Sequence, residues 1–158
     1  MHRQKGFSLI ELLIVVAIIL IIAAIAIPNL LRSRIAANEA SAVGSVRTIN
    51  TAEITYASTY PSTGFTCTLG NLGPATGTPS STSANIIDPV LASGTKSGYS
   101  IGIGSCSGSP VTTSYIVSAA PINQNTTGIR NFCSDQTGVI RYDPGSGTCS
   151  TSTSNPLQ

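Results

Sequence analysis

The sequence GFSLIELLIVVAIILIIAAIAIPNLL, residues 6–31, decides the fold of this 158-residue chain. From Leu12 to Ile27 it contains only Leu, Ile, Val and Ala. As an α-helix, residues 7–31 would extend about 37 Å, which is enough to cross the hydrocarbon core of a bilayer with some tilt. A strand of this length would be unusual, and a helix satisfies its own backbone groups in lipid. We therefore predict a membrane-spanning helix over residues 7–31.

A short basic segment, residues 1–6, precedes this helix and ends at Gly6. An ordinary signal peptide would be cut after the small residues near Ala26, and a plain single-pass anchor would keep the whole amino terminus. Neither fate explains Glu11, which lies just inside the apolar segment. Ionised side chains are costly at membrane depth and usually have a function there. A third fate is implied by a resemblance to a known family.

Residues 5–11, KGFSLIE, resemble the cleavage and methylation site of type IV prepilins and type II secretion pseudopilins. The likeness continues through residues 12–18 and 25–28. It implies that a membrane-embedded prepilin peptidase cuts after Gly6 on the cytoplasmic side and that the same enzyme N-methylates the new terminal Phe7. It also implies that the amino terminus faces the cytoplasm and that an inner-membrane machinery assembles the processed chain.

A cut after Gly6 would give Phe7 a free amine, which is largely protonated at neutral pH because its reference pKa is about 7.7. Within one helix this amine and the Glu11 carboxylate would lie about 6 Å apart along the axis. A neighbouring copy shifted axially by about that distance would pair both charges, which are costly when unpaired in hydrocarbon. We predict that Phe7 and Glu11 set the register of filament assembly. A Glu11 side chain that reaches the headgroups is the plain alternative.

Beyond Pro28 the apolar residues keep to one side of the predicted helix. We expect the helix to run from about Ser8 to Ser58 and to end before Pro61, with residues 32–60 as its amphipathic continuation. Pro28 removes a backbone donor and is expected to kink or break the helix. The resemblance implies that this neighbourhood can melt locally in a filament. The predicted buried face contains Ile35, Ala42, Val46, Ile49, Tyr56 and Tyr60.

Residues 61–158 are rich in Ser, Thr and Gly and contain only six charged side chains. We predict a globular α+β head in which three or four short antiparallel strands pack against the amphipathic helix, with residues 70–84 as a surface loop. The runs with strand-like composition or alternation are 99–104, 114–118, 131–133 and 139–142, the last two around a turn at 135–138.

Four cysteines lie in this head, and an even number in a small exported domain indicates two disulfides. Three connectivities are possible. We favour Cys67–Cys106 with Cys133–Cys149, because the second bond would tie the last strand pair to the tail. Zinc is disfavoured, since there is no CxxC pair and the lone His2 lies in the leader.

Catalysis is not expected, because removal of the leader would leave no histidine and no carboxylate pair of suitable spacing. Major pseudopilins of the family resembled here carry a calcium site near the carboxyl end, where Asp135 and Asp143 flank the last hairpin. Hard cations take six or more oxygen ligands, so we interpret both aspartates as turn or surface residues and keep calcium as a weak alternative. No cofactor is expected.

The predicted mature chain carries six basic and six acidic residues, so no nucleic-acid partner is expected. Arg130 and Arg141 are expected to lie opposite each other across the last hairpin as solvated charges. Residues 125–127, Asn-Thr-Thr, match the N-glycosylation acceptor pattern, which is common by chance.

Together these features predict a structural subunit of a type IV pilus. It would be stored as a single-pass inner-membrane protein and polymerised into an extracellular homopolymer through residues 7–31. The first alternative is the major pseudopilin of a type II secretion system, in a periplasmic pseudopilus. The second is a monomeric membrane-anchored surface binding protein. Adhesion, motility and DNA uptake are all compatible with the sequence.

Overall fold

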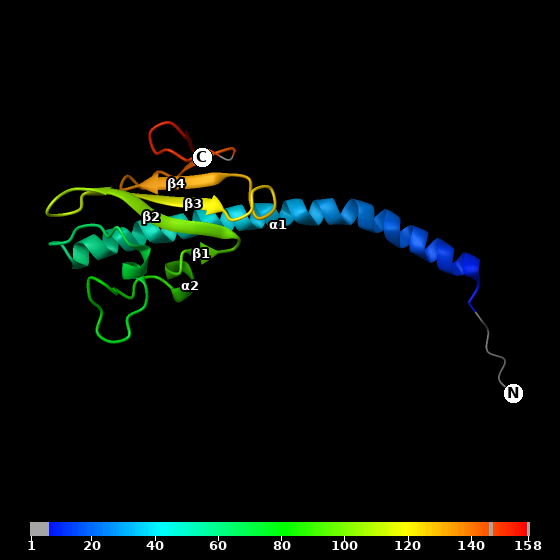
Figure 1. Cartoon of the computed structure of the whole chain (residues 1–158), viewed down its shortest axis with the longest axis horizontal. Coiled ribbons are helices and arrows are strands. Elements are labelled where there is room, and N and C mark those ends of the chain that lie inside the picture. Colours follow the sequence, from blue (N-terminus) through cyan, green and yellow to red (C-terminus); the bar gives the residue numbers. More distant parts are fainter. Residues whose placement is uncertain (1–6, 146, 158) are drawn as a thin grey trace. The chain divides into compact units, whose positions relative to one another are not determined.

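The structure is a computed structural model that describes residues 7–145 and 147–157. The predicted leader, residues 1–6 with Gly6 and His2, lies outside the described residues. The chain divides into two compact units, Met1–Arg34 and Ile35–Gln158. In chain order (Figure 1), the elements are α1 (Leu9–Thr59), the 3-10 helix η1 (Leu69–Leu72), α2 (Pro89–Ala92), β1 (Thr95–Lys96), β2 (Tyr99–Ser107), β3 (Ser114–Pro121), β4 (Asn131–Asp135), β5 (Arg141–Asp143) and β6 (Asn155–Pro156).

Helix α1 confirms the predicted long helix to within one residue at each end. Pro28 lies inside it, and the helix continues through that position. The predicted break is therefore wrong, because a proline leaves only one helical carbonyl, that of Ala24, without its usual donor. A kink at Pro28 stays a prediction.

The part of α1 in the first unit exposes all of its large apolar side chains. Every Leu, Ile, Val and Phe from Phe7 to Leu31 is between 46% and 83% exposed. By length and composition, α1 is the one helix among the described residues that is able to cross a membrane.

In the second unit, α1 supplies one wall of the hydrophobic core. The buried positions recur every three or four residues, which places them on one helical face. The predicted core residues Ala42, Val46, Ile49 and Tyr56 are all buried, whereas Ile35 and Tyr60 are only half-buried. The opposite wall is a sheet whose inward side chains are Tyr99, Ile101, Tyr115, Val117, Ala119 and Phe132.

All strands are antiparallel, in the order β1-β2-β3-β4-β5-β6. Strands β2, β3 and β4 extend alongside the carboxyl half of α1 (Figure 1). The prediction of an α+β head with antiparallel strands is confirmed, but its count of three or four strands is wrong. The two additional strands, β1 and β6, are edge strands of two residues each, too short to show alternation in the sequence.

The segment predicted as a surface loop, residues 70–84, is only partly a loop. It begins within η1, whose Leu72 is fully buried in the core. The short helix α2 was also not predicted. Asp88 caps it by accepting a hydrogen bond from the Leu91 backbone N–H, and Pro89 occupies its first position.

Two disulfides have the connectivity that the sequence analysis favours. Cys67–Cys106 joins the segment after α1 to β2, and Cys133–Cys149 joins β4 to the tail. The Cα atoms are 5.9 Å and 5.7 Å apart, within the usual range for disulfides. Both bonds connect segments of the head that no helix or hairpin joins.

Candidate functional site

At the amino end of α1, Glu11 contacts the backbone of its own chain. Its Oε2 accepts a hydrogen bond of 2.9 Å from the Ser8 backbone N–H, and the Leu12 N–H donates to the Ser8 carbonyl. Ser8 is the residue before the first helical turn and Glu11 is its third residue, so this contact is the glutamate half of a capping box. The spacing Ser-x-x-Glu is visible in the sequence, although the sequence analysis did not use it.

This contact places a carboxylate at the positive end of the helix dipole, where negative charge is stabilised. Glu11 and Phe7 both remain exposed, with Phe7 at 83%. Both residues of the predicted assembly pair are therefore accessible to a second molecule. The exposed apolar side chains from Leu9 to Leu31 continue from them along the helix.

The head holds a second glutamate of α1 in an ion pair. Glu39 accepts hydrogen bonds from the backbone N–H groups of Ile129 and Arg130, at 3.0 and 3.1 Å. The Arg130 guanidinium donates to the same carboxylate, with its Nη2 2.7 Å from Glu39 Oε2, and lies over the rings of Phe132 and Tyr142. This cluster, which we call the Glu39 clamp, fixes the β3–β4 connection to α1.

The Glu39 clamp lowers the pKa of the Glu39 carboxyl below its ordinary value. Burial by itself acts to raise that pKa, but the two backbone N–H groups and the Arg130 guanidinium favour the charged form more strongly. Sequence reasoning missed the clamp because 91 residues separate Glu39 from Arg130. Nothing in a local pattern joins residues so far apart.

A third glutamate of α1, Glu53, is fully buried in the head. Its Oε2 accepts a hydrogen bond of 2.9 Å from the Thr66 backbone N–H. Its Oε1 has no hydrogen-bond partner among the described residues. Burial raises the pKa of Glu53 to about 7, and the single Thr66 hydrogen bond opposes this only in part. Sequence reasoning missed this site as well.

The amino-terminal segment matches a family model described as "Prokaryotic N-terminal methylation motif" over residues 1–27. The first relative is the "Type IV wide pilus major component PilA4" of Thermus thermophilus, 64% identical over 39 residues, or 25% of this chain and 30% of the relative. The second is the "Type IV major pilin protein PilA" of Myxococcus xanthus, 47% identical over 51 residues, or 32% of this chain and 23% of the relative.

Over part of its length, this chain is similar to type IV pilins. The match spans less than a third of the length of either curated relative. No solved structure matches the chain.

In the head, Asp135 and Asp143 do not lie together. Asp143 is opposite Asn131, at the first residue of β4, whereas Asp135 is its last residue, so the strand separates them by about 13 Å. Asp135 accepts hydrogen bonds from Thr137, and Asp143 accepts one from the Gly145 backbone N–H. Each carboxylate stabilises its own turn. The described residues contain no group of three or more metal-binding side chains.

Arg130 and Arg141 of the head are not opposite each other, so that expectation is wrong. Arg141 pairs with Cys133 across the β4–β5 ladder, and Arg130 comes just before β4 in the Glu39 clamp. The Arg141 guanidinium donates to the Ser154 carbonyl instead, at 3.1 Å. The hairpin register, which the sequence does not show, separates the two charges.

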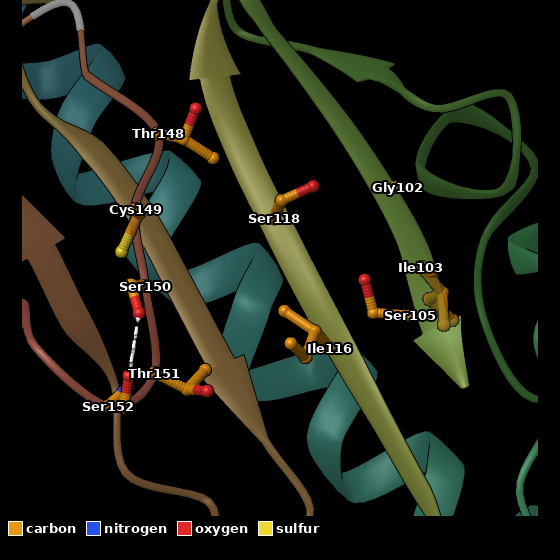
Figure 2. Close-up of a pocket in the computed structure, with 11 residues that line it drawn as sticks. Gly102, Ile103, Ser105, Ile116, Ser118, Thr148, Cys149, Ser150, Thr151 and Ser152 are labelled. Carbon is orange, nitrogen blue, oxygen red and sulfur yellow. Dashed lines mark hydrogen bonds between the residues drawn. The ribbon is translucent and has the colours of Figure 1, made fainter. Parts of the chain in front are cut away.

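On the outer face of the sheet, a groove of about 540 Å³ lies between β2, β3 and the tail (Figure 2). The Cys133–Cys149 disulfide anchors the tail that forms one wall, and a hydrogen bond joins Ser150 Oγ to Ser152 Oγ. None of the eleven described lining residues is charged: Gly102, Ile103, Gly104, Ser105, Ile116, Ser118, Thr148, Cys149, Ser150, Thr151 and Ser152.

Proposed function

We propose that this chain is a structural subunit of a type IV pilus that polymerises through the amino-terminal half of α1. The observation that carries the proposal is the contrast in burial along one helix. The large apolar side chains from Phe7 to Leu31 are all exposed, whereas the core-facing residues of the same helix in the head are buried. A segment this apolar requires lipid or other copies of itself around it.

Processing at Gly6 is part of this proposal. The cut would create the amine of Phe7 next to Ser8, whose backbone N–H already bonds to Glu11 Oε2. The carboxylate has further acceptor positions, because each of its oxygens carries two lone pairs. Glu11 is then able to cap its own helix and to pair with the N-methylated ammonium of a neighbouring copy.

The proposed route begins in the inner membrane and ends in an extracellular filament. A prepilin peptidase would cut and methylate the chain, and an inner-membrane machinery would move it into the growing polymer. The family match supports processing of this kind, since its description is a methylation motif. The role of the subunit is mechanical, and the proposal includes no catalytic step.

Two observations favour a pilus over a secretion pseudopilus. The two relatives are named as components of type IV pili. Of the two aspartates weighed for calcium, Asp135 is the last residue of β4 and Asp143 of β5 pairs with the first residue of β4, so they do not lie together. A monomeric anchored protein would need only the membrane, and it would give Glu11 and the glycine at the proposed cut no role.

The decisive experiment is mass spectrometry of the amino-terminal peptide from sheared surface fibres. We expect the fibres to consist mainly of this chain and its first residue to be N-methylated Phe7. A polypeptide that still begins at Met1, or that begins after Ala26, would contradict the proposed processing. A correctly cut chain found only as monomers in the membrane would contradict the filament.

A further inference from the structure

The carboxylate of Glu53 is buried without a compensating cation. Its side chain is fully buried, and Oε1 has no partner among the described residues. Neither ion pair found among those residues includes it. Removing a carboxylate from water is strongly unfavourable unless hydrogen bonds and opposite charge replace the water. The single hydrogen bond from the Thr66 backbone N–H replaces only a small part of the lost hydration.

The titratable groups packed around Glu53 offer it no positive charge. Tyr56 comes from α1 itself, and Tyr115 comes from β3. The nearby charge of Glu53 contributes to raising the pKa values of Tyr56 and Tyr115, after the larger effect of their own burial. Asp135 of β4 adds a second negative charge near Tyr115. Every titratable group named here is an acid.

The partner of Glu53 lies on a short segment, residues 64–68, that links α1 to the sheet. Thr66 is 2% exposed, and its hydroxyl accepts a hydrogen bond from the Asn71 side chain. The Phe65 N–H donates to the Thr112 carbonyl at 3.1 Å. Cys67 is bonded to Cys106 of β2. The segment is thus held by a few hydrogen bonds, one covalent tether and the packing of Phe65 against Tyr115, whose ring centroids are 4.9 Å apart.

We propose that Glu53 is a proton-controlled latch: its neutral carboxyl holds residues 64–68 against α1, and loss of the proton releases them while the Cys67–Cys106 disulfide keeps them attached. The proton leaves to water, and no bond other than the O–H bond breaks. Opening lets water reach the carboxylate, which the closed form excludes. The head is therefore closed at acidic pH and opens locally at neutral and alkaline pH.

Linkage gives the size of the effect. The pKa of Glu53 is about 7 in the closed head, and its ordinary value of 4.5 applies once water reaches it. The free energy of the open form then falls relative to that of the closed form as pH rises from 4.5 to 7, and the difference is constant above that range. Between pH 5 and pH 8 the opening constant should rise roughly 70-fold.

The test is hydrogen–deuterium exchange of the detergent-solubilised full-length chain at pH 5 and pH 8, corrected for the intrinsic exchange rates. We expect protection of peptides covering residues 61–69 to fall by roughly 70-fold. Peptides from β3, residues 115–119, should remain more protected than residues 61–69 at both pH values, because they exchange only through global unfolding. Because this chain is not assembled, the result is independent of filament formation and of the proposed function.

Two variants and one control complete the test. Glu53→Gln retains an acceptor but cannot ionise, so its protection at residues 61–69 should be independent of pH. Glu53→Met also cannot ionise and carries no polar group, so its protection should likewise be independent of pH. It replaces the glutamine variant in the test if that variant fails to fold. Glu39→Gln, on the same helix, should retain the pH dependence.

Three results of the exchange experiment would overturn the proposal. The first is corrected protection at residues 61–69 that does not change with pH in the unaltered chain. The second is a pH dependence that persists in both Glu53 variants. The third is protection at residues 61–69 that equals that of β3 at both pH values, which would mean that these residues exchange only through global unfolding. Independently of exchange, a ¹³C titration that gives the Glu53 carboxyl a pKa near its ordinary value of 4.5 would also overturn the proposal.

Discussion

The two units of this chain use one helix in opposite ways. In the first unit the large apolar side chains of α1 are at least 46% exposed, whereas in the head Val46 and Ile49 are completely buried. Both parts are helical, and both are apolar on at least one face. The head provides the partner for its own stretch of helix, but the first unit does not. The partner of the first unit must therefore come from outside the chain.

The glutamates of α1 follow the same division. Glu11 is exposed and bonds to one backbone N–H at the helix end, so it remains able to bind a second partner. Glu39 and Glu53 are buried and serve contacts within the head. The comparison can be tested by substituting one side chain at a time and measuring whether filament assembly or the stability of the head changes.

The largest expected effect is on assembly, from Glu11→Ala. In the proposed filament, loss of this carboxylate would leave each Phe7 ammonium unpaired, at a cost of about 3 kcal/mol per subunit. We expect surface fibres to disappear while the chain still inserts into the membrane. Immunoblots of the sheared and membrane fractions measure both.

Ser8→Ala is the matched control, because Glu11 bonds to the Ser8 backbone and not to its side chain. This variant should still form fibres. Normal fibres from the Glu11 variant would instead favour a simple membrane anchor.

The next effect is on the head, from Ile49→Ala. Ile49 is completely buried in the core, so its truncation should destabilise the head by about 2–5 kcal/mol. Ile19→Ala removes the same atoms from a side chain that is 58% exposed, and we expect a change below about 0.5 kcal/mol. Thermal melts of the solubilised full-length chain measure both. Equal destabilisation by the two variants would mean that the first unit has packing of its own.

The features that sequence reasoning predicted correctly are those with a local signal. The boundaries of α1 follow from its apolar run and from Pro61, and the buried face with Val46 and Ile49 follows from helical periodicity. The membrane segment needs only composition and length. The disulfide pairing was a choice among three, supported by the position of the last hairpin.

The features that it missed depend on contacts between distant segments. Glu39 meets Arg130 only because β3 and β4 bring the connection between them back to α1. Glu53 looks like an ordinary surface residue of a helix until the segment with Thr66 covers it. The hairpin register also decides that Arg141 lies opposite Cys133 and not beside Arg130. Such pairings are properties of the folded head.

A smaller effect, confined to the head, is expected from Glu39→Gln. The Arg130 side chain is 39% exposed, so solvent weakens the ion pair, and we expect a loss of about 1–2 kcal/mol. The clamp lowers the pKa of Glu39, so its stabilisation is present above the ordinary value of 4.5 and is lost as pH falls through the lowered pKa.

Below pH 4.5, melts of the unaltered chain should therefore show an acid-induced loss of stability that is smaller in the Glu39→Gln variant, which has no carboxylate at this position to protonate. Lys96→Ala breaks the exposed Lys96–Asp88 pair and should leave the melting temperature unchanged. A Glu39→Gln variant whose stability matches the unaltered chain at pH 7 would show that the clamp does not stabilise the head.

The smallest effect is expected to be a gain, at the floor of the groove on the outer face of the sheet. Gly102 lies within β2, no heavy atom lies within 4 Å of the position that a Cβ would occupy, and its φ is not positive. Glycine in a strand is destabilising by about 0.5–1 kcal/mol relative to alanine, so Gly102→Ala should raise the free energy of unfolding by about that amount.

Gly128→Ala is the opposing control, because its Cβ would meet the ring and hydroxyl of the buried Tyr99. This variant should destabilise the head. The two glycines thus show within the head the same contrast as the exposed and buried parts of α1. An added methyl group is tolerated at Gly102, where space is open, and not at Gly128, where the Tyr99 side chain already fills the space. A loss of stability in Gly102→Ala would mean that a segment of the chain packs into the groove in solution.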